Sequence, residues 1–145
     1  MPKIDFYVLK DESATAGYQF ACKLIEKAYT LQHLLDVLTP DQASSQIIDD
    51  LLWTFKQGSF IPHETYTGGS INSPILIGCN FQSRNPAPAE NSVLVNLSNQ
   101  VPDYFSHYQR ITEIVCGDAD NRQSARGRFQ FYRDKGFQPK SHPIN

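Results

Sequence analysis

The sequence has few cysteines and no long hydrophobic run. Its cysteines, Cys22, Cys79 and Cys116, are odd in number and widely spread, which excludes a disulfide framework and is typical of free thiols in a reducing compartment. We expect them to act as small buried hydrophobic residues. No uninterrupted apolar stretch is long enough to span a membrane, and the N-terminus does not have the pattern of a signal peptide. These absences predict a cytoplasmic protein without membrane contact.

Glycine is scarce where a nucleotide-binding protein would need it. The turn after the first predicted strand, Leu9–Gly17, contains one glycine and the adjacent carboxylates Asp11 and Glu12. A phosphate-binding turn needs glycines so that the backbone can approach the phosphate, and it does not tolerate fixed negative charge. We therefore expect no nucleotide and no other cofactor.

Patterns for catalysis and metal binding are also missing. No Gly-x-Ser-x-Gly elbow is present, and the histidines show no metal-ligand spacing. Asp49-Asp50 and His63-Glu64 could be drawn as an acid–base set, but adjacent helix residues point in different directions. Exposed helix charges are the simpler interpretation of both aspartates. The sequence predicts no catalytic residue and no metal ligand, and its histidines are His33, His63, His107 and His142.

Charge is unevenly distributed along a chain whose length, 145 residues, fits a single domain spanning residues 1–145. Residues 1–109 carry 6 Lys/Arg against 11 Asp/Glu, whereas residues 110–145 carry 7 against 4. An acidic body with a basic C-terminal end does not predict strong direct binding to nucleic acid over a large surface. Any anionic partner is expected to dock at the C-terminal end, although a solvated basic helix face is the commoner explanation of such a run.

Near-continuous apolar segments alternate with helical patterns. Such segments are typical of parallel strands buried on both faces of a sheet. The pattern predicts a three-layer α/β/α fold with a mostly parallel central sheet, Rossmann-like but without a nucleotide site. The predicted strands are Ile4–Leu9, His33–Leu38, Pro74–Gly78, Ser92–Leu97 and Arg110–Cys116, and the predicted helices are 15–29, one that begins at Thr39 and leads to Trp53, and 118–135.

The ends of two helices have specific signals. Thr39 is predicted as an N-cap, with Pro40 at the first helical position and Gln42 completing a capping box. Gly136 is predicted as the left-handed C-cap of the last helix, with Phe137 folding back onto the final turn.

A cluster of large apolar residues follows the second predicted helix. The single tryptophan, Trp53, lies at its end, and Phe60, Ile61, Pro62 and His63 follow in the next loop. Large aromatic residues at such an edge are candidate anchors for a protein partner. The alternative, that Trp53 and Phe60 close the bottom of the core, is equally compatible with their spacing.

The last predicted helix has a basic stripe. Arg122, Arg126, Phe129 and Arg133 stand at i, i+4, i+7 and i+11, which places them on one face. Guanidinium groups beside an aromatic ring suit a peptide with acidic groups and an apolar end. The alternative is that Phe129 belongs to the core together with Tyr132.

Several segments together resemble the chi subunit family of bacterial DNA polymerase III, over nearly the whole chain. The combination of Leu-Trp with Ser-Phe-Ile-Pro-His is the most specific part. The segments are Phe6-Tyr7-Val8-Leu9, Ile48-Asp49-Asp50-Leu51-Leu52-Trp53, Ser59-Phe60-Ile61-Pro62-His63, Val93-Leu94-Val95-Asn96-Leu97-Ser98 with Pro102, Ile111-Thr112-Glu113-Ile114-Val115, Ala125-Arg126 and Tyr132-Arg133-Asp134-Lys135-Gly136-Phe137.

The resemblance implies a non-enzymatic accessory subunit of the clamp-loader complex. It implies a psi-subunit interface at Trp53, Phe60, Ile61, Pro62 and His63, in a 1:1 heterodimer of psi with a monomeric chain. It also implies a pocket for the acidic C-terminal tail of single-stranded-DNA-binding protein. By position, that pocket is formed by Val115, Arg122, Arg126, Phe129 and Gln130, with Arg133 as a further charge.

Two positions depart from the family pattern, and two other function classes stay open. Gln130 stands where a lysine can stand, and Phe129 replaces a tyrosine. One competing class is a small Rossmann-like hydrolase or nucleotide-binding protein. The other is a direct nucleic-acid binder that uses the basic stripe.

Overall fold

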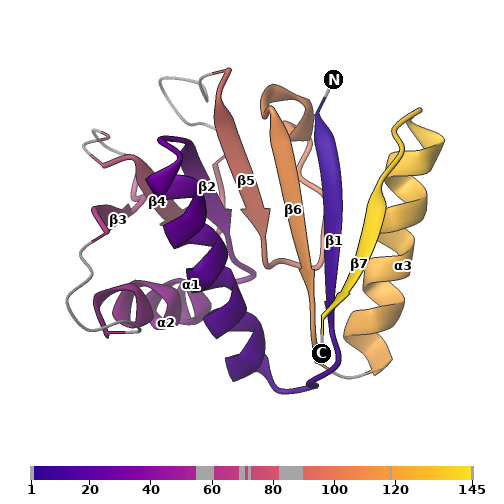
Figure 1. The fold of residues 1–145 in the computed structure, drawn as a ribbon, viewed down its shortest axis with the longest axis horizontal. Coiled ribbons are helices and arrows are strands. Elements are labelled where there is room, and N and C mark those ends of the chain that lie inside the picture. The colour runs from indigo at the N-terminus through magenta and orange to yellow at the C-terminus, as the bar shows by residue number, and fades with distance from the viewer. Residues whose placement is uncertain are drawn as a thin grey trace.

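The described part of the protein forms a parallel sheet with helices on both faces (Figure 1). This computed structural model describes residues 2–54, 61–68, 71, 73–81, 90–117 and 119–144. The sheet has 7 strands in the order β3-β4-β2-β5-β6-β1-β7, and all its described pairings are parallel. The elements are β1 (Lys3–Leu9), α1 (Ala14–Thr30), β2 (Leu34–Leu38), α2 (Gln42–Thr54), β3 (His63–Thr65), β4 (Ile75–Gly78), β5 (Ser92–Asn96), the 3-10 helix η1 (Phe105–His107), β6 (Arg110–Val115), α3 (Ala119–Asp134) and β7 (Lys140–Ile144).

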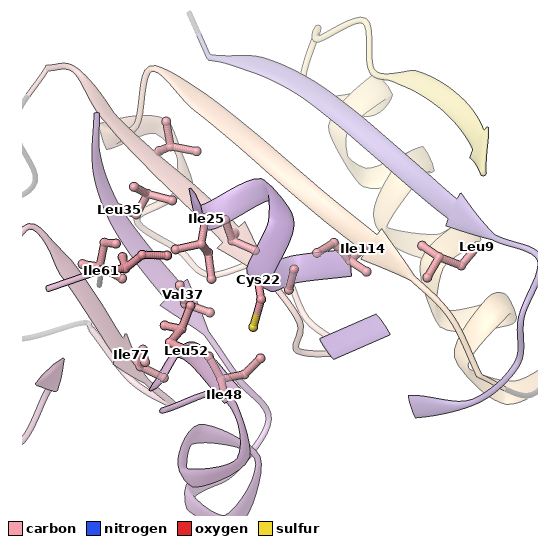
Figure 2. Packing of buried hydrophobic residues seen from close by; sticks show 14 residues of the cluster. Leu9, Cys22, Ile25, Leu35, Val37, Ile48, Leu52, Ile61, Ile77 and Ile114 are labelled. Carbon is pink, nitrogen blue, oxygen red and sulfur yellow. The ribbon is translucent and has the colours of Figure 1, made fainter. Parts of the chain in front are cut away.

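One face of the sheet is covered by α1 and α2, and the other by α3 and η1. Side chains alternate between the two faces along each strand, so Leu9 joins the first core while Phe6 joins the second. Figure 2 shows the first core, where Cys22 and Ile25 of α1 meet Val37 of β2. The three-layer architecture predicted from the sequence is therefore confirmed.

All five predicted strands are present, but the two edge strands, β3 and β7, were missed. β3 has three residues, His-Glu-Thr, and β7 is mostly exposed and contains Pro143. An edge strand pairs on one side and can include proline, so it needs no continuous apolar run. Short polar strands of this kind carry no hydropathy signal.

The predicted capping box of the second helix is wrong. Thr39 does not accept a bond from the helix start; its hydroxyl donates to the Asp41 carbonyl (2.9 Å) and contacts the Ser45 hydroxyl (2.6 Å). The cap is Asp41, whose Oδ1 accepts from the Ser44 N–H at 2.7 Å. That bond lowers the pKa of the Asp41 carboxyl, and α2 begins at Gln42.

The predicted end of the last helix is confirmed. Gly136 has φ 93°, and its N–H donates to the Arg133 carbonyl at 3.0 Å. The Phe137 N–H donates to the Tyr132 carbonyl at 3.0 Å, which completes a Schellman motif. Phe137 then packs back onto Phe105, with ring centroids 5.5 Å apart.

A buried polar network fixes α3 to the sheet. The fully buried Glu113 of β6 accepts from Arg128 Nε (2.9 Å), the Tyr132 hydroxyl (2.7 Å) and Asn96 Nδ2 (3.0 Å). Burial raises the pKa of the Glu113 carboxyl, while the Arg128 guanidinium and the three hydrogen bonds oppose that shift. The network joins β5, β6 and α3, and it determines the position of the helix that carries the basic stripe.

We predict that Glu113→Gln lowers the free energy of unfolding by about 3 kcal/mol, because it leaves the Arg128 charge buried without its ion-pair partner. Urea denaturation followed by circular dichroism measures the change. Asp50→Asn is the matched control, since Asp50 is exposed and its carboxylate accepts from Gln46 on the same helix. Equal stability of the two variants would contradict the proposed role of the network.

Candidate functional site

The crevice where nucleotide-binding sheets hold their ligand is present, but it lacks a phosphate cradle. It lies at the carboxyl ends of the strands, where the turn after β1 leads to one face and the turn after β6 to the other. Its cavity of about 180 Å³ includes Gly17, Tyr18 and Cys116. A side chain at Gly17 would meet the Cys116 thiol, so this glycine allows close packing of α1 on the sheet.

Negative charge in the turn after β1 is maintained by local hydrogen bonds. Asp11 Oδ1 accepts from the Ser13 N–H at 2.8 Å, which lowers the pKa of the Asp11 carboxyl. Ser13 Oγ in turn caps α1 by accepting from the Ala16 N–H at 3.1 Å. A charged carboxylate at this turn disfavours a phosphate group.

The three cysteines are free thiols in different environments. Cys22 is fully buried in the first core, and burial raises its pKa to about 12. Cys116 is half-buried and its pKa is also raised by burial, whereas Cys79 is exposed. The interpretation as buried hydrophobic residues therefore holds for Cys22 but not for Cys79. Within the residues that the structure describes, no cluster of His, Cys, Asp and Glu could hold a metal ion, and no helix is long and apolar enough to cross a membrane.

The basic stripe of α3 borders an open cavity of about 200 Å³. Four of the predicted residues line it, and the sheet contributes the opposite wall. The lining residues are Phe6, Val8, Val115, Arg122, Ala125, Arg126, Phe129 and Ser141.

The floor of this α3 cavity is apolar. Val115 is 5% exposed, and the half-buried Phe129 packs on Phe6 with ring centroids 5.1 Å apart. Phe129 thus packs at the edge of the second core, as the alternative interpretation predicted, and it also lines the cavity.

The side chains of the two arginines of the α3 cavity differ in conformational freedom. Arg122 donates from Nη2 to the Leu9 carbonyl at 2.8 Å, which holds its guanidinium at the end of β1. Arg126 is exposed and contacts Gln123 Oε1 at 3.3 Å along its own helix. Arg122 therefore presents a fixed charge, while Arg126 can reorient toward a ligand.

Two predicted residues lie outside the cavity lining. Gln130 is exposed and donates to Asp134 Oδ1 at 2.8 Å, and Arg133 is exposed near the helix end. Other lining residues of the cavity were not predicted from the sequence. Phe6 and Val8 share one face of β1 by alternation, a usable signal, whereas Ser141 comes from the unrecognised strand β7.

The predicted anchor surface is exposed only in part. Trp53 is 53% exposed, and Ile47 on the same helix is 43% exposed. Ile61 is buried at 2% in the first core, Pro62 is half-buried, and His63 is 8% exposed. Trp53 therefore lies on the surface, the buried His63 ring packs against it, and Ile61 belongs to the first core. The remaining predicted anchor, Phe60, lies outside the described residues.

His63 connects this anchor surface to α2. Its ring lies 4.6 Å from the Trp53 ring, and its Nε2 lies 3.3 Å from Asp49 Oδ1. Asp50 instead accepts from Gln46 Nε2 at 2.9 Å, so the adjacent aspartates do point in different directions.

The anchor surface and the α3 cavity lie at opposite edges of the sheet. The anchor surface is carried by α2 and β3, and β3 is one edge strand. The cavity is formed by α3 with β1, the end of β6 and β7, which is the other edge strand. The layout leaves room for two separate partners.

Comparisons with known proteins agree with the resemblance. The family described as DNA polymerase III chi subunit, HolC, matches residues 1–140. DNA polymerase III subunit chi of Pseudomonas aeruginosa is 30% identical over 144 residues, which are 99% of this chain and 98% of the relative. The Haemophilus influenzae subunit is 23% identical, with 91% and 90% covered, and the Escherichia coli subunit is 21% identical, with 94% and 95% covered. The chain therefore belongs to the DNA polymerase III chi subunit family and is an accessory subunit of the replicative polymerase.

Proposed function

We propose that this protein is a non-catalytic bridge in the clamp-loader complex. One surface binds the psi subunit, and the other binds the acidic C-terminal tail of single-stranded-DNA-binding protein. The observation that carries the proposal is the separation of the exposed Trp53 surface from the α3 cavity, at opposite edges of one sheet.

The chemistry of the α3 cavity fits an acidic peptide with an aromatic end. Arg122 and Arg126 offer guanidinium groups to carboxylates, and charge-assisted hydrogen bonds of this kind are stronger than neutral ones. Phe6, Val115 and Phe129 offer an apolar floor to a terminal ring. Because Arg122 is already held by the Leu9 carbonyl, less side-chain entropy is lost when a carboxylate binds it.

The Trp53 surface fits an apolar partner. Trp53, 53% exposed, and Ile47, 43% exposed, are the large hydrophobic residues that α2 leaves exposed. Exposed aromatics of this type are frequent hot spots in protein interfaces. We assign this surface to the psi subunit, in a 1:1 heterodimer.

We predict that Arg126→Ala weakens binding of a peptide matching the acidic, aromatic-ended tail by roughly 1 kcal/mol, about fivefold. Fluorescence titration of labelled peptide measures it. Part of the affinity should fall with added salt, since the cavity is open to solvent.

Arg133→Ala is the matched control, because Arg133 is an exposed arginine of the same helix that does not line the α3 cavity. Arg133→Ala should reduce the binding free energy of the tail peptide by at most half as much as Arg126→Ala does. An equal loss in both variants would mean that general positive charge, rather than the cavity, attracts the peptide.

We predict that Trp53→Ala, and likewise Phe60→Ala, weakens psi binding by about 2 kcal/mol or more, roughly 30-fold, while binding of the tail peptide is unchanged. Isothermal titration with purified psi gives the affinity. Leu31→Ala is the control, since Leu31 is 62% exposed but lies at the end of α1. Unchanged affinity of the Trp53 variant would remove the anchor surface from the proposal.

We predict that psi and the tail peptide bind the chain together, with the affinity for each changed less than about twofold by the other. Titration of the peptide into free chain and into the preformed psi complex tests this expectation. Competition between the two ligands would contradict the proposed bridge.

A further inference from the structure

The helices leave part of one sheet face open. On the face that carries the first core, α1 lies over β2 and α2 lies over β3 and β4, whereas Figure 1 shows β1 and β7 with no described helix in front of them. Every second residue of a strand points to this face. On the three neighbouring strands β6, β1 and β7, these residues are Lys3, Asp5, Tyr7, Leu9, Arg110, Thr112, Ile114, Lys140, His142 and Ile144.

The amino-terminal half of this area, together with Lys27 at the edge of α1, is rich in positive charge, and we call it the open patch. Lys3 stands opposite Arg110 in the register of β1 with β6, and Lys140 stands opposite Asp5 in that of β1 with β7. Lys27 and Arg110 line the same shallow cavity of about 80 Å³. All four basic residues are exposed, so their charges are available to a ligand.

Negative charge near the open patch is withdrawn from its surface. Asp5 is the acidic residue among the outward positions of these three strands, and it is only 4% exposed. Its Oδ1 accepts from His142 Nε2 at 2.8 Å. Glu26 is adjacent to Lys27, and adjacent helix residues point in different directions, so it does not share the side that Lys27 turns to the cavity. The exposed charge of the open patch is therefore positive.

Three rings lie among these basic residues. The Tyr7 ring stacks beside that of His142, with centroids 5.0 Å apart and an interplanar angle of 24°, and it lies 5.4 Å from the Phe20 ring of α1. The His142 side chain is 41% exposed, and Tyr7 and Phe20 are half-buried. Rings among cations suit a single nucleic-acid strand, because its phosphates and the π faces of its bases are accessible at the same time. A duplex hides its base faces.

We propose that the open patch binds single-stranded DNA, with the four basic residues at the phosphates and the Tyr7 and His142 rings against the bases. The patch is small and residues 1–109 carry a net negative charge, so the binding is weak and independent of base sequence. The inference does not depend on psi or on the tail peptide. β7 turns Ser141 to the α3 cavity and His142 to the opposite face, so the two sites are separate.

Fluorescence anisotropy of a labelled oligothymidylate of about 12 nucleotides tests the inference with the whole chain. The expected dissociation constant is roughly 10 to 100 μM at low salt, and the affinity should fall as salt is added, because about three phosphate contacts release counterions. Absence of binding at a chain concentration of about 1 mM, above the usual range of non-specific dissociation constants, would overturn the inference.

Two double variants, each of which removes two positive charges, test the location of the site. Arg110→Gln with Lys140→Gln should weaken binding about tenfold and reduce its salt dependence. Lys10→Gln with Arg133→Gln is the matched control, because Lys10 follows the carboxyl end of β1 and Arg133 lies on α3, which covers the other face. The control should change the affinity less than about twofold. Equal losses would show that overall charge, and not the open patch, attracts the strand.

A change of ligand tests stacking without altering the protein. An abasic strand of the same length keeps the phosphates but lacks the bases, and it should bind about tenfold more weakly, as should a duplex of that length. Tyr7→Leu should weaken binding of the thymidylate about fivefold and leave the affinity for the abasic strand unchanged. Equal affinity of the wild type for both strands would contradict the role of the rings. Tighter binding of polyglutamate would instead assign the patch to an acidic protein and refute the proposal.

Discussion

Because each strand runs parallel to its neighbours, each connection must cross from one end of the sheet to the other. Crossovers are right-handed, and the chain moves one way across the sheet from β1 through β2 to β3 but the other way from β6 to β7, so α1 and α2 lie on one face and α3 on the other. The same order makes β3 and β7 the two edge strands. The Trp53 surface forms where α2 meets the first edge, and the α3 cavity forms where α3 meets the second. The separation of the candidate interfaces is thus a consequence of strand order and crossover handedness.

Buried carboxyl groups connect the strands of this fold to neighbouring elements. Glu113 ties α3 to β5 and β6, Asp36 of β2 accepts from the Tyr108 hydroxyl at 2.6 Å, and Asp5 of β1 pairs with His142 of β7. Each acid joins its strand to a different element, so each pair specifies a register or a helix position as well as satisfying a buried group. A carboxylate committed to three donors, as Glu113 is, has little capacity left for other chemistry.

The crevice at the carboxyl ends of β1 and β6 has the place of a nucleotide site, but its residues do not suit a phosphate group. Gly17 serves packing against Cys116, and Asp11 keeps a negative charge where a phosphate would lie. The features that suit recognition of other molecules lie on α2 and α3 instead. They are the exposed indole of Trp53, the guanidinium of Arg122 that is held by the Leu9 carbonyl, and the exposed guanidinium of Arg126.

Several features could be predicted from the sequence because their signals are local. Continuous apolar runs predicted the five inner strands, helical spacing predicted the stripe of Arg122, Arg126 and Phe129, and a single glycine predicted the end of α3. Each depends on hydropathy or backbone conformation within a few residues. The aromatic Trp53 at the end of its helix was likewise visible as a candidate anchor.

Tertiary structure decided the features that depend on partners distant in sequence. β3 and β7 form strands because they pair with the outer strands β4 and β1 of the sheet. Asp41 rather than Thr39 caps α2, because the Thr39 hydroxyl is hydrogen-bonded to the Ser45 hydroxyl. Ile61 turns into the core, Gln130 bonds along its own helix, and His63 meets Asp49 across 14 residues of chain. Composition and spacing do not encode which of several polar partners a side chain reaches, because that choice follows from how the layers pack.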